Sequence, residues 1–173
     1  LEEEVYDLTF GSREWRLLDA GRITRREANE RMLQRARAVG RGFEVEGVLD
    51  DWMSMLHPRR RMQTLVEQLK QRGYCVYYLS NIPEDVLDLL MHRDFEGLFD
   101  GGVASCEVKV NKPDPRIYQT LLDKYHLRAD ECIFIDDRAD NLVAASALGF
   151  GTYEMHGVGT LLRSLPTFGV SLH

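Results

Sequence analysis

The feature that most constrains the fold is the alternation of short apolar segments with helical segments after Pro58. The expected strands are 74–81 (YCVYYLSN), 101–105 (GGVAS), 132–136 (CIFID) and 151–155 (GTYEM). The expected helices are 59–73, 83–94, 115–126, 139–149 and 157–165. Strands that are apolar on both faces and alternate with helices are typical of a parallel sheet covered by helices. We therefore predict an α/β fold with helices on both faces of a parallel sheet.

The chain before Pro58 has a different period. Residues 12–56 carry apolar side chains at helical spacing, with a break at Gly21. Thr24 and Glu27 form a capping-box pattern that predicts the start of a second helix, and a third is expected from Phe43. We predict two units: an all-helical lobe over 1–57 and an α/β core over 58–173.

Composition and charge narrow the class of protein. The net charge of −6 argues against partners such as nucleic acid or an anionic membrane. No apolar run approaches the roughly 20 residues that cross a bilayer. Cys75, Cys106 and Cys132 show no metal-binding or redox spacing and are predicted to be reduced. A cytoplasmic location follows as an expectation, while the oligomeric state stays open.

Polar residues follow two of the predicted strands. In open α/β sheets, ligands bind outside the carboxyl ends of the strands. Ser80 and Asn81 end one strand, and the next helix starts near Pro83, so they either bind an anion or cap that helix. Asp136 and Asp137 end another strand. They either bind a hard cation such as Mg²⁺, or one caps the next helix and the other is solvated.

A lysine is expected at the same edge of the sheet. Lys112 precedes Pro113, which restricts it to an extended backbone, and it could offset the charge of carboxylates or of a phosphate. The alternative is a solvated surface lysine. Lys109 is a less rigidly fixed competitor for the same role.

These three segments occur in an order that resembles the haloacid dehalogenase-like (HAD) hydrolases. YYLSN, NKPDPRIY and FIDDRADNLVAASALG are similar to the second, third and fourth motifs of that family, and DAGRIT is similar to a recurring element of its helical cap. The resemblance implies a Rossmann-like core with a small cap. The most similar subgroup contains the phosphatase domain of soluble epoxide hydrolase and bacterial sugar-phosphate phosphatases.

The resemblance also implies roles for individual residues. Ser80 and Asn81 would contact the substrate phosphate, and Lys112 would stabilise the nucleophile and the phosphate. Asp137 would be a Mg²⁺ ligand, with Asp136 as a second ligand or a water-holding group. Asn141 stands where many members have an acid. The cap residues Trp15, Arg16, Arg22 and Trp52 are either substrate contacts or, for the tryptophans, cap core.

The family's nucleophilic aspartate, which ends a first strand and forms an aspartyl-phosphate, is not found. Asp7 is the sole candidate, but three glutamates precede it where a buried strand should be apolar, and Thr9 stands where a second acid belongs. We expect Asp7 to be an exposed cap residue. The residues as they stand would lack the first strand and be inactive. Three functions stay open: a Mg²⁺-dependent phosphatase for a small phosphorylated metabolite, an inactive binding domain, and a metal-free dehalogenase.

Overall fold

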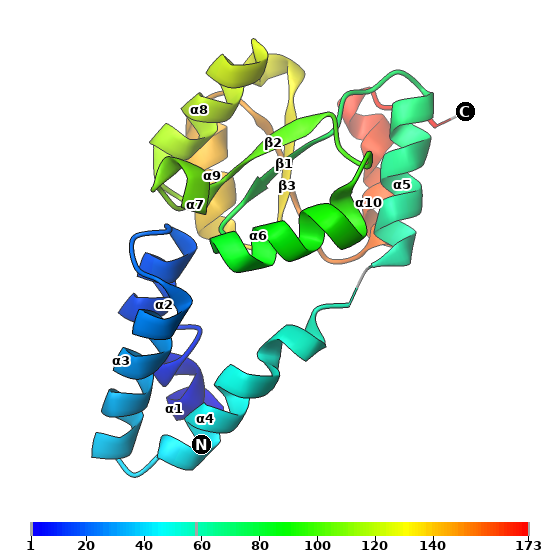
Figure 1. The fold of residues 1–173 in the computed structure, drawn as a ribbon. Helices are drawn as coiled ribbons and strands as arrows, with labels where there is room; N and C mark the ends of the chain where they lie inside the picture. The colour runs from blue at the N-terminus through cyan, green and yellow to red at the C-terminus, as the bar shows by residue number, and fades with distance from the viewer. Residues whose placement is uncertain (1, 58, 173) are drawn as a thin grey trace.

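The computed structural model describes residues 2–57 and 59–172, and it places four short parallel strands at the centre of an α/β core (Figure 1). β1 (Tyr77–Ser80) pairs with β2 (Gly101–Ala104), in a register that sets Ser80 opposite Ala104. β3 (Ile133–Asp136) pairs with β4 (Gly151–Glu154), in a register that sets Asp136 opposite Glu154. The predicted α/β fold with parallel strands is confirmed, although each strand is shorter than its apolar segment.

The strands form two parallel pairs rather than one continuous sheet. Within the described residues, no backbone pairing joins β1 to β3. Ile135, in the middle of β3, is 36% exposed although it belongs to an apolar strand.

Helices surround the two strand pairs. The core contains α5 (Arg60–Gln71), α6 (Glu84–Leu90) with a π-helical turn η2 (Met91–Phe95), α7 (Ser105–Val108), α8 (Pro115–Tyr125), η3 (Ala129–Glu131), α9 (Ala139–Ala147), α10 (Val158–Ser164) and η4 (Leu165–Phe168). The helices α8 and α9 pack on the strands through a cluster that includes Ile117, Tyr118 and Phe134. The helices α5 and α10 meet through Leu65 and Leu161, and Figure 1 shows them side by side at the other end of the core.

The N-terminal helices form a separate apolar cluster. They are α1 (Glu2–Leu8), α2 (Arg13–Asp19), α3 (Arg25–Ala38), α4 (Gly42–Asp51) and the short 3₁₀ helix η1 (Trp52–Met55). Ala28, Met32 and Val45 are fully buried in this lobe. Thr24 and Glu27 make the predicted capping box at the start of α3. The boundary between the two predicted units falls at residue 58, outside the described residues, and stays a prediction.

Three local features differ from or add to the expectations. The sequence did not predict α1, which contains Asp7 as an exposed residue; this segment is therefore a helix and not the end of a strand. Cys75, which belongs to the apolar segment 74–81 that was expected as a strand, is exposed and precedes β1, which begins at Tyr77. No helix in the described ranges is both long and apolar enough to cross a bilayer.

The helical lobe and the core meet at a stacked arginine. The Arg25 guanidinium lies 5.3 Å from the ring centre of Trp15 and 4.6 Å from that of Trp52. It also donates two hydrogen bonds, of 2.9 and 3.1 Å, to the carboxylate of Asp85 on α6. Cation–π stacking and a forked carboxylate contact together fix the guanidinium in one orientation. The two tryptophans therefore act as packing residues of this junction.

A carboxyl group at the same junction has an unusual pKa. Burial raises the pKa of Asp19 from 3.8 to about 7; the Arg25 charge opposes this shift and the Asp85 charge adds to it. The folded protein therefore holds this proton more tightly than the unfolded chain does. The free energy of unfolding must then fall as the pH rises from about 4 to about 7, because Asp19 is made to ionise in a buried place.

We expect Asp19→Asn to remove this pH dependence. The variant should resemble the wild-type protein in stability near pH 4 and become progressively more stable than it up to pH 7, with a higher Tm at pH 8. Urea unfolding across this pH range measures the difference. Parallel stability curves for the two proteins would show that Asp19 titrates normally.

Candidate active site

A buried ion pair connects two loops at the carboxyl ends of the strands. The Nζ atom of Lys112, in the loop between α7 and α8, lies 2.6 Å from Oδ2 of Asp136 at the end of β3. The side chains are only 10% and 7% exposed. The lysine ammonium also lies 5.3 Å from the ring centre of Phe134. Lys112 is therefore not the solvated surface lysine of the alternative interpretation.

The backbone of Lys112 is held from the end of β1. The side-chain amide of Asn81 donates to the carbonyl oxygen of Lys112 at 3.0 Å and accepts from its amide nitrogen at 2.7 Å. This pair of bonds ties the loop to β1, while the ammonium ties it to β3. Asn81 thus positions Lys112, and its predicted contact with a substrate phosphate stays a prediction.

Asp136 is surrounded by hydrogen-bond donors. Its Oδ1 atom accepts from the backbone nitrogen of Arg138 at 2.9 Å and from Nδ2 of Asn141 at 3.0 Å. Burial alone would raise the pKa of Asp136, but the hydrogen bonds from Lys112 and Asn141 outweigh it and hold the pKa below 3.8. The carboxylate is therefore ionised at neutral pH and serves to anchor the lysine.

Asp137, the other predicted metal ligand, lies outside this buried network. Asp137 is exposed, and in the described ranges no hydrogen bond involves its carboxylate. The Oδ1 atom of Asn141 is buried and also lacks a partner there. A carboxylate oxygen and an amide oxygen that accept no hydrogen bond suit a hard cation such as Mg²⁺. Both oxygens of Asp136, by contrast, already accept hydrogen bonds. Among the described residues, no group of three or more acidic, histidine or cysteine side chains forms a metal site.

Ser80 ends β1 opposite Ala104, with its side chain half-buried. Neither Ser80 nor Asn81 caps the following helix, so the capping interpretation is wrong. The helix α6 has no side-chain cap at Pro83; the hydroxyl of Ser105 instead accepts from the amide nitrogen of Ile82, just before that helix, at 2.9 Å. The sequence did not single out Ser105, whose only signal was its position at the end of the predicted strand 101–105.

Lys109 lies away from this ion pair. It has a left-handed backbone with φ of 59°, and its Nζ atom donates to the carbonyl oxygen of Gly21 in the helical lobe at 2.9 Å. The structure therefore brings Lys112, Asp136, Asn81 and Asn141 into one network and leaves Lys109 outside it. The preference for Lys112 over Lys109 agrees with this geometry.

Comparison with known proteins places this site in a family context. Residues 4–149 match the family model described as haloacid dehalogenase-like hydrolase. The sesquiterpene phosphatase astK of Aspergillus oryzae is 33% identical over 142 residues, which are 81% of this chain and 71% of that protein. Bifunctional epoxide hydrolase 2 of Mus musculus is 27% identical over 134 residues, which are 71% of this chain and 23% of that protein.

Solved structures share the fold. A predicted HAD-like hydrolase from Porphyromonas gingivalis aligns with a TM-score of 0.74 at 24% identity, over 94% of this chain and 83% of that one. A HAD-family enzyme from Bacteroides thetaiotaomicron, solved with magnesium and inorganic phosphate, aligns with a TM-score of 0.67 at 25% identity, over 93% and 83%. The resemblance inferred from three sequence motifs is thereby confirmed.

Because Lys112 is buried and Asp137 is exposed, their substitutions should lower the free energy of unfolding by different amounts. In magnesium-free buffer, Lys112→Met should cost about 3–5 kcal/mol, because it leaves the Asp136 carboxylate buried without its cation. Asp137→Asn should change stability by no more than about 0.5 kcal/mol, because its carboxylate is exposed. Urea unfolding measures both values.

The double variant Lys112→Met with Asp136→Asn is the matched control. It should recover part of the loss, since no buried charge is then left unpaired. Equal costs for Lys112→Met and Asp137→Asn would contradict the burial of the ion pair.

Proposed function

Because the chain belongs to the haloacid dehalogenase-like hydrolase family, we propose that it forms part of a magnesium-dependent phosphatase for a small phosphorylated metabolite. The observation that carries this proposal is the fixed ammonium group of Lys112 at the carboxyl ends of β1 and β3. A phosphate group brings two negative charges, and phosphoryl transfer depends mainly on positioning and on neutralising them.

Each residue of the network has a defined part in this proposal. Lys112 offers a cation whose place is set by Asp136 through its side chain and by Asn81 through its backbone. Ser80, at the end of β1, offers a hydroxyl group to a phosphate oxygen. The Asp136 carboxylate, whose pKa lies below its usual value, holds the Lys112 side chain in place through their ion pair. The attacking carboxylate that the family resemblance implies is not identified in the described ranges.

Magnesium is proposed as the cofactor, with Asp137 and the free oxygen of Asn141 as the groups that fit it. When bound, such an ion would offset the negative charge of the phosphate. Support for this cofactor comes from the Bacteroides enzyme, which was crystallised with magnesium and inorganic phosphate. Asp136 as a direct ligand stays a prediction, and its bonded oxygens favour a role as the anchor of Lys112.

The names of relatives support more than one activity. The fungal relative is a sesquiterpene phosphatase. The (S)-2-haloacid dehalogenase 4A of Burkholderia cepacia is 32% identical over 95 residues, which are 54% of this chain and 41% of that protein. The adjacent Asp136 and Asp137 favour the metal-dependent phosphatase, because the resemblance implies that dehalogenases lack this pair. An inactive binding domain is the further alternative.

Phosphate release from an aryl phosphate by the full-length protein tests the proposed function. We expect turnover with Mg²⁺, none with a chelator, and none for Asp137→Ala at any Mg²⁺ concentration. Unchanged turnover in Asp137→Ala would contradict the assignment of Asp137 as a Mg²⁺ ligand. Halide release from a 2-haloacid without metal would favour the dehalogenase. The absence of both phosphate release and halide release would favour a binding domain.

The two lysines provide a matched pair of variants. Lys112→Ala should lower kcat by on the order of a hundredfold or more, because it removes a fixed charge from the reacting end of the site. Lys109→Ala should have a small effect, since its ammonium contacts only the carbonyl oxygen of Gly21 among the described residues. Steady-state kinetics of the full-length variants compare them, and equal losses would show that the wrong lysine is assigned.

A further inference from the structure

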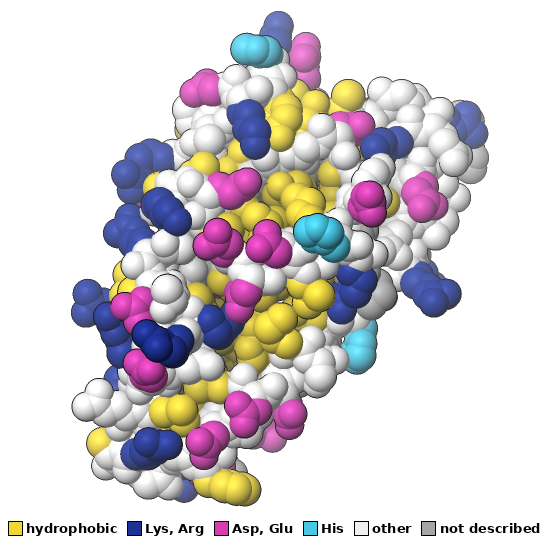
Figure 2. All heavy atoms as spheres, in the orientation of Figure 1, with side chains coloured by type: hydrophobic (Ala, Val, Ile, Leu, Met, Phe, Trp, Pro, Cys, Tyr) yellow, Lys and Arg dark blue, Asp and Glu magenta, His cyan; other side chains and the backbone are white. Residues whose placement is uncertain are grey.

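The outer face of α4 carries side chains that no described part of the chain covers. Val45 and Leu49 turn inward and join the apolar cluster of the helical lobe. Phe43, Gly47 and Asp50 lie at helical spacing on the opposite side, and all three are exposed. Figure 1 places α4 at the lower end of the lobe, where Figure 2 shows hydrophobic and acidic side chains together. This helix face is therefore open to another molecule.

Phe43 is the most exposed large apolar side chain among the described residues. It is 88% exposed, and in the described ranges no aromatic contact involves its ring. Val39, in the turn before α4, is 55% exposed as well. An aromatic ring buried at the centre of an interface contributes much of the binding energy. Phe43 contributes nothing of this kind to the lobe itself, which makes it a candidate for a contact with a partner.

Gly47 lies one turn after Phe43, in the middle of α4. A glycine in a helix interior is destabilising relative to alanine. The lobe gives no steric reason for this glycine, because a Cβ atom there would meet no heavy atom of the described chain within 4 Å. The missing side chain leaves a gap on the outer face, next to the ring of Phe43. A gap of this kind allows a second helix to approach closely.

Both ends of α4 carry charges that the helix dipole disfavours. Asp50 and Asp51 are its last two residues, at the negative end of the dipole, and Arg41 directly precedes its first residue. The two aspartate carboxylates have no hydrogen bond or ion pair within the described part of the chain. Arg41 is partly exposed and pairs with Glu4 at 2.9 Å. Opposite charges supplied from outside would stabilise the carboxyl end of the helix.

A second copy of α4, laid antiparallel, complements this face in shape and in charge. Phe43 and Gly47 lie two positions on either side of Val45. A two-fold axis near Val45 therefore sets Phe43 of each copy over the gap at the partner's Gly47. The same arrangement brings the Arg41 end of one helix to the Asp50 end of the other, and it opposes the two helix dipoles.

We propose that the outer face of α4 is a homodimer interface, in which Phe43 of each copy packs over the partner's Gly47. The partner is a second copy of this chain, because the face is complementary to itself. A contact made by one short helix from each copy is small, so the dimer should be reversible and should form in a concentration-dependent way. This proposal does not rest on the proposed phosphatase activity.

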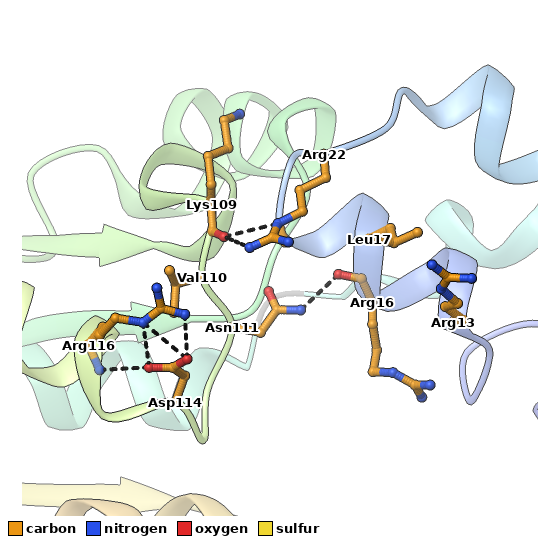
Figure 3. Close-up of a pocket in the computed structure, with 10 residues that line it drawn as sticks. Arg13, Arg16, Leu17, Arg22, Lys109, Val110, Asn111, Asp114 and Arg116 are labelled. Atoms are coloured by element: carbon orange, nitrogen blue, oxygen red, sulfur yellow. Dashed lines mark hydrogen bonds and ion pairs between the residues drawn. The ribbon is translucent and has the colours of Figure 1, made fainter.

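The helical lobe contacts the core through its other end. Arg22 donates to the carbonyl oxygen of Lys109 at 3.0 and 3.3 Å, and Asn111 donates to the carbonyl oxygen of Arg16 at 2.8 Å (Figure 3). Figure 1 shows the start of α4 at the opposite end of the lobe. A dimer formed through Phe43 and Gly47 would therefore leave these contacts between lobe and core intact.

Sedimentation velocity of the full-length protein over a range of concentrations tests the interface. We expect a dimer whose fraction rises with concentration. Phe43→Ser should weaken dimerisation by about tenfold or more, because symmetry removes the ring from both sides of the contact. It should leave the Tm of the dilute monomer unchanged, since the ring is exposed. The control Val143→Ser removes a side chain that is 70% exposed on α9 and should leave dimerisation unchanged.

A substitution at Gly47 separates an interface from a structural role. Gly47→Gln should raise the Tm of the dilute monomer, because glutamine is the better helix former. It should weaken dimerisation by roughly tenfold, because its side chain fills the gap that receives Phe43. A full-length protein that stays monomeric at every concentration would overturn the proposal. A dimer that persists in both Phe43→Ser and Gly47→Gln would also overturn it, because another face would then hold the copies together.

Discussion

The buried pair of Lys112 and Asp136 is the interaction on which the arrangement of the site depends. A lysine and a carboxylate each lose hydration when they are buried, and only close contact with further hydrogen bonds offsets that loss. Here Asn81 fixes the lysine backbone, and Asn141 with the amide nitrogen of Arg138 satisfies the carboxylate. The pair connects the ends of β1 and β3, which are otherwise not joined by backbone hydrogen bonds in the described residues.

The junction between the helical lobe and the core depends on an arginine that contacts two aromatic rings and a carboxylate. Arg25 is held between two indole rings and by Asp85, while Asp19 nearby has a pKa of about 7. We therefore expect the folded protein to lose stability as Asp19 ionises. Arg22 and Lys109 add hydrogen bonds across the same boundary, to the carbonyl oxygens of Lys109 and Gly21 respectively.

Much of the core could be predicted from the sequence because its periodicity is strong. The apolar runs that end at Ser80 and Asp136 indicated strands, and Lys112 before Pro113 indicated a fixed lysine. The local pattern could not show that Asn81 would bond the backbone of Lys112, a residue 31 positions away, because this contact depends on tertiary packing. Nor could it show α1, because the helix opens with three glutamates and packs on the lobe through the buried Leu8.

The most direct test of a phosphate-processing site is a crystal structure of the full-length protein with magnesium and inorganic phosphate. We expect phosphate within hydrogen-bonding distance of Nζ of Lys112 and the hydroxyl of Ser80, with the metal ion bound by Asp137. The ion pair of Lys112 with Asp136 should persist in that complex. Phosphate and metal bound elsewhere, with the Lys112 end of the strands filled by protein side chains, would contradict it.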